Sequence, residues 1–65
     1  MDLAKIKDSF GLNLSVFAQK CGVGYAHLTM ILKGRRAITN EAKVKILNGV
    51  RQLRDELTDF LQENE

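Results

Sequence analysis

Apolar residues recur along the first third of the chain at the spacing of short amphipathic helices separated by glycines. Leu3, Ile6 and Phe10 stand at i, i+3 and i+7, which predicts a first helix over residues 2–10. Gly11 follows directly and suits the left-handed residue that ends many helices. The chain is therefore expected to begin with one short helix.

A second helix is predicted over residues 14–21, because Asn13 is a good N-cap. Its apolar positions are Phe17, Ala18 and Cys21, which we expect to be buried. Gly22 then turns the chain, Val23 fills the angle between two helices, and Gly24 opens the next one. This Gly-x-Gly does not predict a phosphate-binding loop, since no strand precedes it and no Lys-Ser/Thr follows.

The third predicted helix, residues 25–33, separates its apolar side chains from a mixed face. At 100° per residue, Leu28, Ile31 and Leu32 cluster on one side. The opposite side carries Tyr25, Ala26, Thr29, Met30 and Lys33. Gly34 ends the helix, and Arg35 to Ile38 form the connection that follows. A short helix of this kind, with cations at its end, is typical of an element that enters a DNA major groove.

A long last helix is predicted from Asn40 to about residue 62, with Thr39 as its N-cap. Its apolar residues are spaced 4, 3, 4, 3 and form a heptad seam of Ile46, Val50, Leu53, Leu57 and Phe60. Val44 and Leu47 lie off the seam and are expected to face the chain's own core. The alternative is that Gly49 ends a helix and residues 50–62 fold back as a fifth one. The seam crosses Gly49 in phase and no N-cap follows, which favours one continuous helix.

Length and composition predict one small all-α domain, a four-helix helix-turn-helix domain with an extended C-terminal helix. The chain has 65 residues, no Pro and a single Cys, which favours a reducing cytosol over a disulfide scaffold. Residues 1–47 are expected to form the helix-turn-helix part and residues 48–65 a helical extension of the same domain. We expect no signal peptide and no membrane segment, since no apolar run approaches the roughly 20 residues that a membrane helix needs.

The formal net charge of +2 hides a strong asymmetry. Residues 1–54 hold all ten Lys and Arg against three acidic residues, a net charge of +7, whereas residues 55–65 hold five acidic residues, a net charge of −5. This pattern favours a basic surface for a polyanion and an acidic end that faces away from it. The alternative is a solvated helix with a charged tip.

Several residue pairs in the stretch from about residue 12 to residue 47 resemble the lambda-repressor-like helix-turn-helix family of phage repressors, Cro proteins and bacterial regulators. The pairs are Phe17-Ala18, Gly22-Val23, Leu28-Thr29, Ile31-Leu32 and Lys33-Gly34. They match the family's second helix, turn, recognition helix and closing Gly in type and spacing. The chain departs from the family at Leu14, where many members carry a Gln that braces a phosphate. Its long last helix also replaces the family's short fourth and fifth helices.

The resemblance implies which residues touch DNA. The positions that contact base edges correspond to Tyr25, Ala26, Thr29 and Met30. The Tyr25 hydroxyl can donate or accept a hydrogen bond, and Met30 and Ala26 can pack on thymine methyl groups. The alternative is that Tyr25 and Met30 only cover neighbouring core.

Phosphate contacts are predicted for Asn13, His27, Lys33, Arg35 and Arg36. Such contacts position a protein on DNA without carrying sequence information. The alternative for the cations is that they are simply solvated.

Other chemistries find little support in the sequence. Cys21 occupies an apolar position typical of a small buried hydrophobe rather than a redox sensor. His27 has no nearby Cys or second His, so no metal site is expected. Ser9, Ser15 and Asp8 lack a credible base and an enclosed pocket, so we expect neither catalysis nor a cofactor or small-molecule ligand.

The sequence as a whole predicts a DNA-binding transcriptional regulator, a promoter-occupying repressor of phage, plasmid or mobile-element type. It is expected to act in the bacterial cytosol or nucleoid, or in the cytosol of a phage-infected host. A homodimer joined through the heptad seam would place two recognition helices on a palindromic operator, with half-sites about 34–36 Å apart. The alternative is a protein-interaction module or an antitoxin that keeps this fold and docks a partner through the C-terminal apolar stripe.

Overall fold

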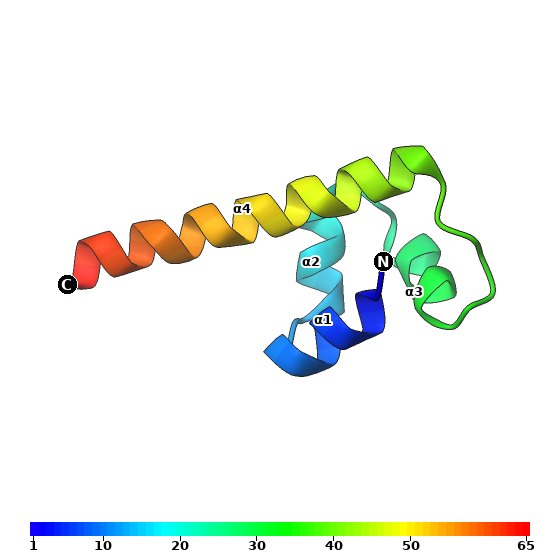
Figure 1. Cartoon of the computed structure of the whole chain (residues 1–65), viewed down its shortest axis with the longest axis horizontal. Helices are drawn as coiled ribbons and strands as arrows, with labels where there is room; N and C mark the ends of the chain where they lie inside the picture. Colours follow the sequence, from blue (N-terminus) through cyan, green and yellow to red (C-terminus); the bar gives the residue numbers. More distant parts are fainter.

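The computed structural model describes all 65 residues and contains four α-helices and no strand (Figure 1). The helices are α1 (Leu3–Phe10), α2 (Leu14–Cys21), α3 (Tyr25–Leu32) and α4 (Asn40–Asn64). The predicted all-α fold with a long C-terminal helix is thereby confirmed. None of the four helices combines the length and the apolar character that crossing a lipid bilayer requires.

Side-chain caps fix where the helices begin. The Asn13 side-chain oxygen accepts a hydrogen bond from the backbone N–H of Val16 at 3.1 Å, and α2 starts one residue after Asn13. Thr39 Oγ1 accepts from the N–H of Ala42 at 3.1 Å in the same way at α4. Asp2 caps α1 and therefore lies just outside that helix rather than in it. Each cap satisfies one of the backbone donors that a helix start leaves free.

The turn between α2 and α3 is built around a left-handed glycine. Gly22 has φ of 71°, its N–H donates to Gln19 O at 3.2 Å, and the N–H of Val23 donates to Ala18 O at 3.1 Å. This pair of bonds is a Schellman motif, which stops the helix and reverses the chain direction. Gly34 ends α3 with the same conformation, at φ of 72°.

The core contains residues from every helix, and α2 lies at its centre, in contact with both α3 and α4. Leu28 of α3 and Ile46 of α4 are its two fully buried large side chains. The other buried apolar residues are Leu3, Phe17, Ala18, Cys21, Val23, Ile31 and Ala42. The predicted burial of the α2 residues and the filling of the interhelical angle by Val23 are confirmed.

Helix α4 runs without a break through Gly49, so the alternative of a fifth helix is wrong. Gly49 is buried and faces α2 at Cys21. A Cβ atom added there would overlap Cys21 Sγ and would lie 3.2 Å from both the Cα and the backbone N of Cys21. The glycine is therefore needed for the close approach of two helices and does not act as a helix end.

The heptad seam divides into a buried and an exposed half. Ile46 is fully buried in the chain's own core, so its assignment to a dimer interface was wrong. Val50 and Leu53 are partly buried against the same core. Only Leu57 and Phe60, 65% and 60% exposed, are left without a partner. The seam is therefore one apolar stripe that begins in the core of the domain and ends on solvent-exposed surface.

The expectation that Val44 and Leu47 face the core is also wrong, since both are exposed. Ala42, Ile46 and Gly49 are the buried residues of α4, at i, i+4 and i+7. This spacing defines one narrow face of the helix, and Val44 and Leu47 fall outside it. The other three helices all lie on one side of α4, so the opposite side of α4 faces solvent (Figure 1).

An ion pair joins α2 to the second half of α4. Lys20 Nζ of α2 lies 2.7 Å from Glu56 Oε2. Both side chains keep some solvent exposure, so the pair contributes a modest amount to stability. Beyond Glu56 the helix extends away from the domain, and we call residues 57–64 the projecting segment (Figure 1).

Gly49→Ala should lower the free energy of unfolding. Overpacking a helix contact costs about 1–3 kcal/mol, whereas Ala gains only about 1 kcal/mol over Gly in a helix interior. We therefore expect a net loss in urea denaturation. Gly24→Ala is the matched control, since its added Cβ meets nothing within 4 Å. Cys21→Ala should restore part of the loss by removing the overlapping sulfur, and an unchanged stability of Gly49→Ala would refute the close-approach role.

Candidate functional site

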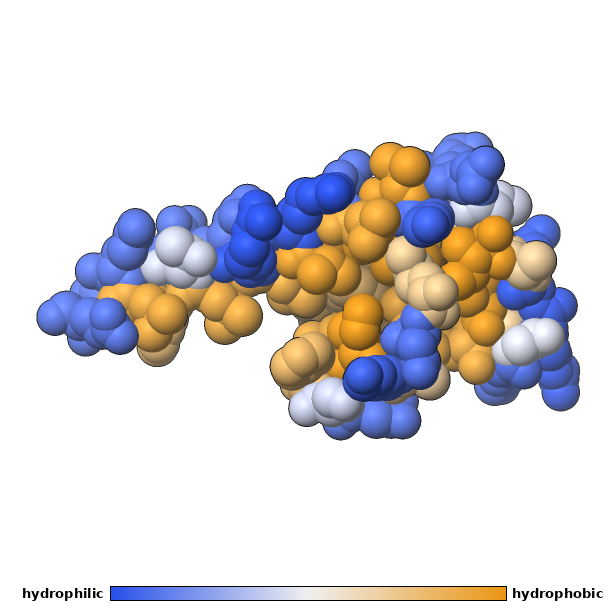
Figure 2. Space-filling view, in the orientation of Figure 1, coloured by the Kyte–Doolittle hydropathy of each residue, from blue (hydrophilic) through white to orange (hydrophobic).

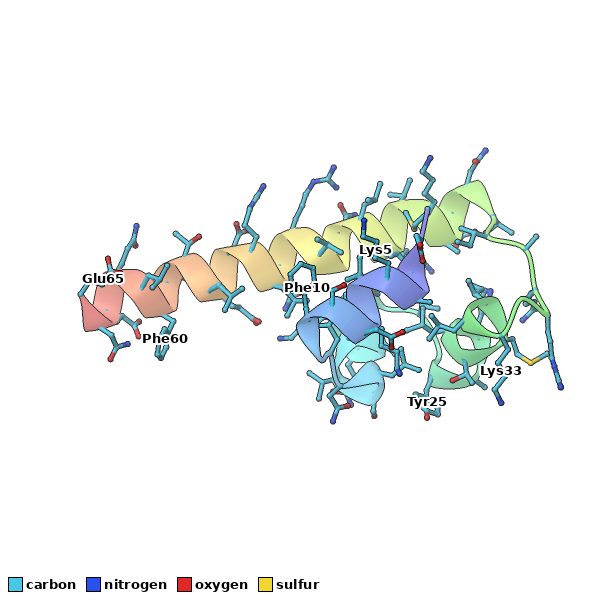
Figure 3. All side chains as sticks on the ribbon, turned by 60° about the horizontal axis from the view of Figure 1, so that its bottom comes forward. Lys5, Phe10, Tyr25, Lys33, Phe60 and Glu65 are labelled. Carbon is cyan, nitrogen blue, oxygen red and sulfur yellow. The ribbon has the colours of Figure 1, made fainter.

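Helix α3 presents one side to solvent, as its sequence predicts. Leu28 and Ile31 are buried in the core, while Tyr25 and Met30 are 56% and 39% exposed. We call the residues of the open side the outward face: Tyr25, Ala26, Thr29, Met30 and Lys33. Figure 3 shows Tyr25 and Lys33 projecting on the same side of α3, away from α4. The alternative that Tyr25 and Met30 only cover core is therefore not favoured by their exposure.

The polar groups of the outward face differ in how free they are. Thr29 Oγ1 donates to the backbone O of Tyr25 at 2.9 Å, so its proton is used within the helix and only its lone pairs face outward. No side-chain hydrogen bond of the chain involves the Tyr25 hydroxyl. Tyr25 therefore offers both a donor and an acceptor to an external molecule.

Three unpaired cations follow the outward face. Lys33, Arg35 and Arg36, which we call the cationic group, are exposed and take part in no ion pair. The paired cations of the chain are Lys7, Lys20, Lys45 and Arg54. No Asp or Glu occurs between Ser9 and Asn40. The end of α3 and the loop after it therefore carry positive charge that no neighbouring carboxylate in the sequence offsets.

A shallow hollow between α1 and α3 adds a cation that the sequence analysis missed. Its polar lining consists of Lys7 and Asp8 from α1, Tyr25 and Thr29 from α3, and Lys33 at the C-cap of α3. Lys7 lies 3.8 Å from Asp8, a weak and exposed ion pair. The periodicity of α1 places Lys7 on the helix surface, but only the packing of α1 against α3 brings it beside the outward face.

His27 and Asn13 are less well placed for the phosphate contacts predicted for them. His27 is partly buried and lines a different hollow, with Glu41 and Lys45 at the start of α4. It lies on the flank of α3 opposite Tyr25, because two residues turn a helix by about 200°. Asn13 uses its side-chain oxygen as a helix cap, which leaves its amide N–H groups as donors.

Cys21 is a structural residue in this fold. Its thiol is buried, and burial raises its pKa, so the reactive thiolate form is disfavoured. The Cys21 thiol donates a weak hydrogen bond to the backbone O of Ile46 at 3.9 Å, and this bond joins α2 to α4. No group of three or more His, Cys, Asp or Glu residues lies close enough together to hold a metal ion.

The charge asymmetry of the sequence becomes a spatial separation. The molecule measures 42 × 22 × 18 Å, and α3 and the C-terminus lie at opposite ends of the longest axis (Figure 1). The acidic residues from Asp55 onward therefore lie far from the cationic group. They neither neutralise it nor repel an anion bound there.

Comparison with models of known protein families, with curated proteins and with solved structures finds no match to this chain. The likeness to the lambda-repressor-like family therefore stays a prediction from the sequence.

Proposed function

We propose that this chain is a sequence-specific DNA-binding regulator of transcription, a promoter-occupying repressor of phage, plasmid or mobile-element type that acts in the bacterial cytosol. One observation carries the proposal. An exposed helix face with small, aromatic and hydroxyl side chains lies directly beside three cations that no carboxylate pairs. This combination suits a major groove, where base edges are flanked by phosphates.

The outward face of α3 supplies the base contacts in this proposal. The Tyr25 hydroxyl donates to or accepts from a base edge, and Thr29 accepts through its free lone pairs. Met30 and Ala26 pack against thymine methyl groups. The Schellman turn at Gly22 and the buried Leu28 hold α3 rigidly, so these side chains reach DNA at fixed positions.

The cationic group supplies affinity. Lys33, Arg35 and Arg36 neutralise backbone phosphates and release counterions, which makes binding depend on salt. Lys7, across the hollow from Lys33, is a further candidate for a phosphate contact. Exchange of its weak partner Asp8 for a phosphate costs little.

A second copy of the chain completes the proposal. One short recognition helix reads few base pairs, and two related by a two-fold axis read a palindromic operator. The projecting segment carries the exposed apolar side chains of Leu57 and Phe60, which a second copy would cover. The acidic C-terminal end lies far from α3 and so does not oppose binding to DNA.

A protein-docking role without DNA, such as that of an antitoxin, is the second candidate function. The exposed apolar side chains of the projecting segment favour it. A mobility shift with random DNA across a salt series separates the two candidates, since the docking role alone predicts no salt-dependent binding. Selection of bound sites from a random oligonucleotide pool then reports the operator and its half-site spacing.

Replacement of a member of the cationic group by Ala should weaken binding to every DNA sequence alike. Each lost phosphate contact should also reduce the slope of log K against log salt by about 1. The measurement is a salt titration of binding by fluorescence anisotropy. Arg51→Ala, on the exposed surface of α4, is the control and should leave the slope unchanged. A triple variant with the slope of the parent chain would remove the cationic group from the interface.

Tyr25→Ala or Met30→Ala should reduce discrimination between operator and random DNA by about 1–3 kcal/mol for each lost specific contact. Affinity for random DNA should change little, because phosphate contacts supply it. Competition binding with both DNAs measures the ratio, and Val44→Ala, an exposed apolar residue of α4, is the control. Equal losses on the two DNAs would mean that these side chains only support the fold.

Leu57→Asp should dissociate the dimer and lower operator affinity while leaving the helical content intact. The aspartate would place an unpaired charge in an apolar contact, which is costly. Val44→Asp introduces the same charge at another exposed apolar residue of α4 and should leave the dimer intact. Sedimentation equilibrium at tens of micromolar measures the oligomeric state of the parent chain and of both variants. A monomeric parent chain would exclude the dimer altogether.

A further inference from the structure

The projecting segment and the end of α1 expose apolar side chains toward the same open space. Leu57, Phe60 and Leu61 of α4 are all more than half exposed, and Phe10 at the end of α1 is 73% exposed. Figure 3 shows Phe60 on the side of α4 where α1 and Phe10 lie. Figure 2 shows apolar surface along the underside of the projecting segment and, across a gap, at the tip of the domain.

The molecule exposes more surface than a compact monomer of the same mass. The chain exposes 4820 Å² at a mass of 7.3 kDa. A compact monomer of that mass exposes about 4,200 Å². The difference, about 600 Å², approaches the roughly 800 Å² that each partner contributes to a standard protein interface.

The charges along α4 differ in what they meet when a second copy lies on the projecting segment in parallel or antiparallel. Residues 55–65 contain five acidic residues and no Lys or Arg. Two copies side by side in parallel would place these acidic stretches next to each other, with no cation between them. An antiparallel pair that overlaps at residues 53–65 instead places Arg54 of each copy beside Glu65 of the partner subunit, so that opposite charges meet at both ends of the overlap.

We propose that the projecting segment of α4 pairs antiparallel with the same segment of a second copy of this chain. This inference rests on the proposed homodimer and specifies its geometry. The two-fold axis passes near Asp59, so that Leu57 of each copy packs beside Leu61 of the partner subunit. Arg54 then lies near Asn64 and Glu65 of the partner subunit, and the apolar stripe of each α4 faces the other.

The antiparallel arrangement also accounts for Phe10. An overlap of residues 53–65 brings the end of each α4 beside Leu53 of the partner subunit, on the side of that helix where the partner's α1 lies. Phe10 is the most exposed large apolar side chain of the chain, and it lies at the end of α1 on the same side of α4 as Phe60 (Figure 3). The partner's helix end covers it. A parallel pair would direct both helix ends away from the domains and leave Phe10 in solvent.

Engineered cysteines distinguish the two orientations. Arg54→Cys and Asn64→Cys are made as separate variants, mixed, and oxidised gently; Cys21 stays native because it is buried. The antiparallel pair predicts a disulfide-linked species only in the mixture, joining residue 54 of one copy to residue 64 of the other. In this geometry two copies of residue 54 lie about 15 Å apart along the axis, beyond the roughly 7 Å between Cα atoms that a disulfide spans.

Each outcome of this experiment supports or overturns the antiparallel pair. Disulfides within each single variant, and none specific to the mixture, would indicate a parallel pair and overturn the inference. A dimer by sedimentation with no disulfide in any sample would place the interface elsewhere, and a monomer would likewise overturn the inference. Gln62→Cys is the control, since it lies on the helix face away from the stripe and should not link.

The same samples separate this inference from the proposed function. DNA binding by a parallel dimer would overturn the antiparallel geometry alone, whereas DNA binding by a monomer would overturn the homodimer and leave the DNA-binding function standing. An antiparallel dimer that shows no salt-dependent affinity for DNA would overturn the DNA-binding function alone. Phe10→Ser adds a further test of the geometry, since it should weaken the antiparallel dimer without affecting a contact confined to the two α4 helices.

Discussion

The close crossing of α4 over α2 at Gly49 and Cys21 is the contact on which the rest of the fold depends. At 65 residues the chain can bury only a small core, so its helices must approach closely to exclude water. The absence of a side chain at Gly49 brings the backbone of α4 against Cys21, and this closeness lets Ile46 reach full burial beside α2. Because α3 is held by the turn from α2, the same contact sets where the outward face of α3 points.

Much of the backbone could be predicted because its signals are local. Asn13 and Thr39 cap helices, and Gly22 and Gly34 end them, through hydrogen bonds within a few residues. The division of α3 into buried and exposed sides follows from its periodicity alone. The exposure of the outward face was therefore predictable, whereas the approach of Lys7 to it was not, because that depends on how two helices pack.

The heptad seam shows where periodicity stops being informative. A 4-3 spacing indicates that one stripe of a helix is buried, but it does not say against what. The first half of the seam, at Ile46, is buried by the chain's own α2, while the second half, at Leu57 and Phe60, extends past the domain. The signal that divides the halves is Gly49, since a glycine inside an otherwise strong helix marks a close backbone approach. Gly49 suggests a helix end in the sequence and a helix contact in the structure.

One long helix allows a very small protein to keep two opposing charges apart. Positive charge beside the outward face favours a polyanion, while an acidic stretch limits the overall charge to +2. Were the two close, the carboxylates would pair with the cations or repel the phosphates, since screening at physiological salt takes effect only over about 8 Å. A rigid helix separates them at the cost of apolar surface that the domain cannot cover. The proposed second copy would cover that surface, so the same extended helix that separates the charges also supplies the surface for pairing.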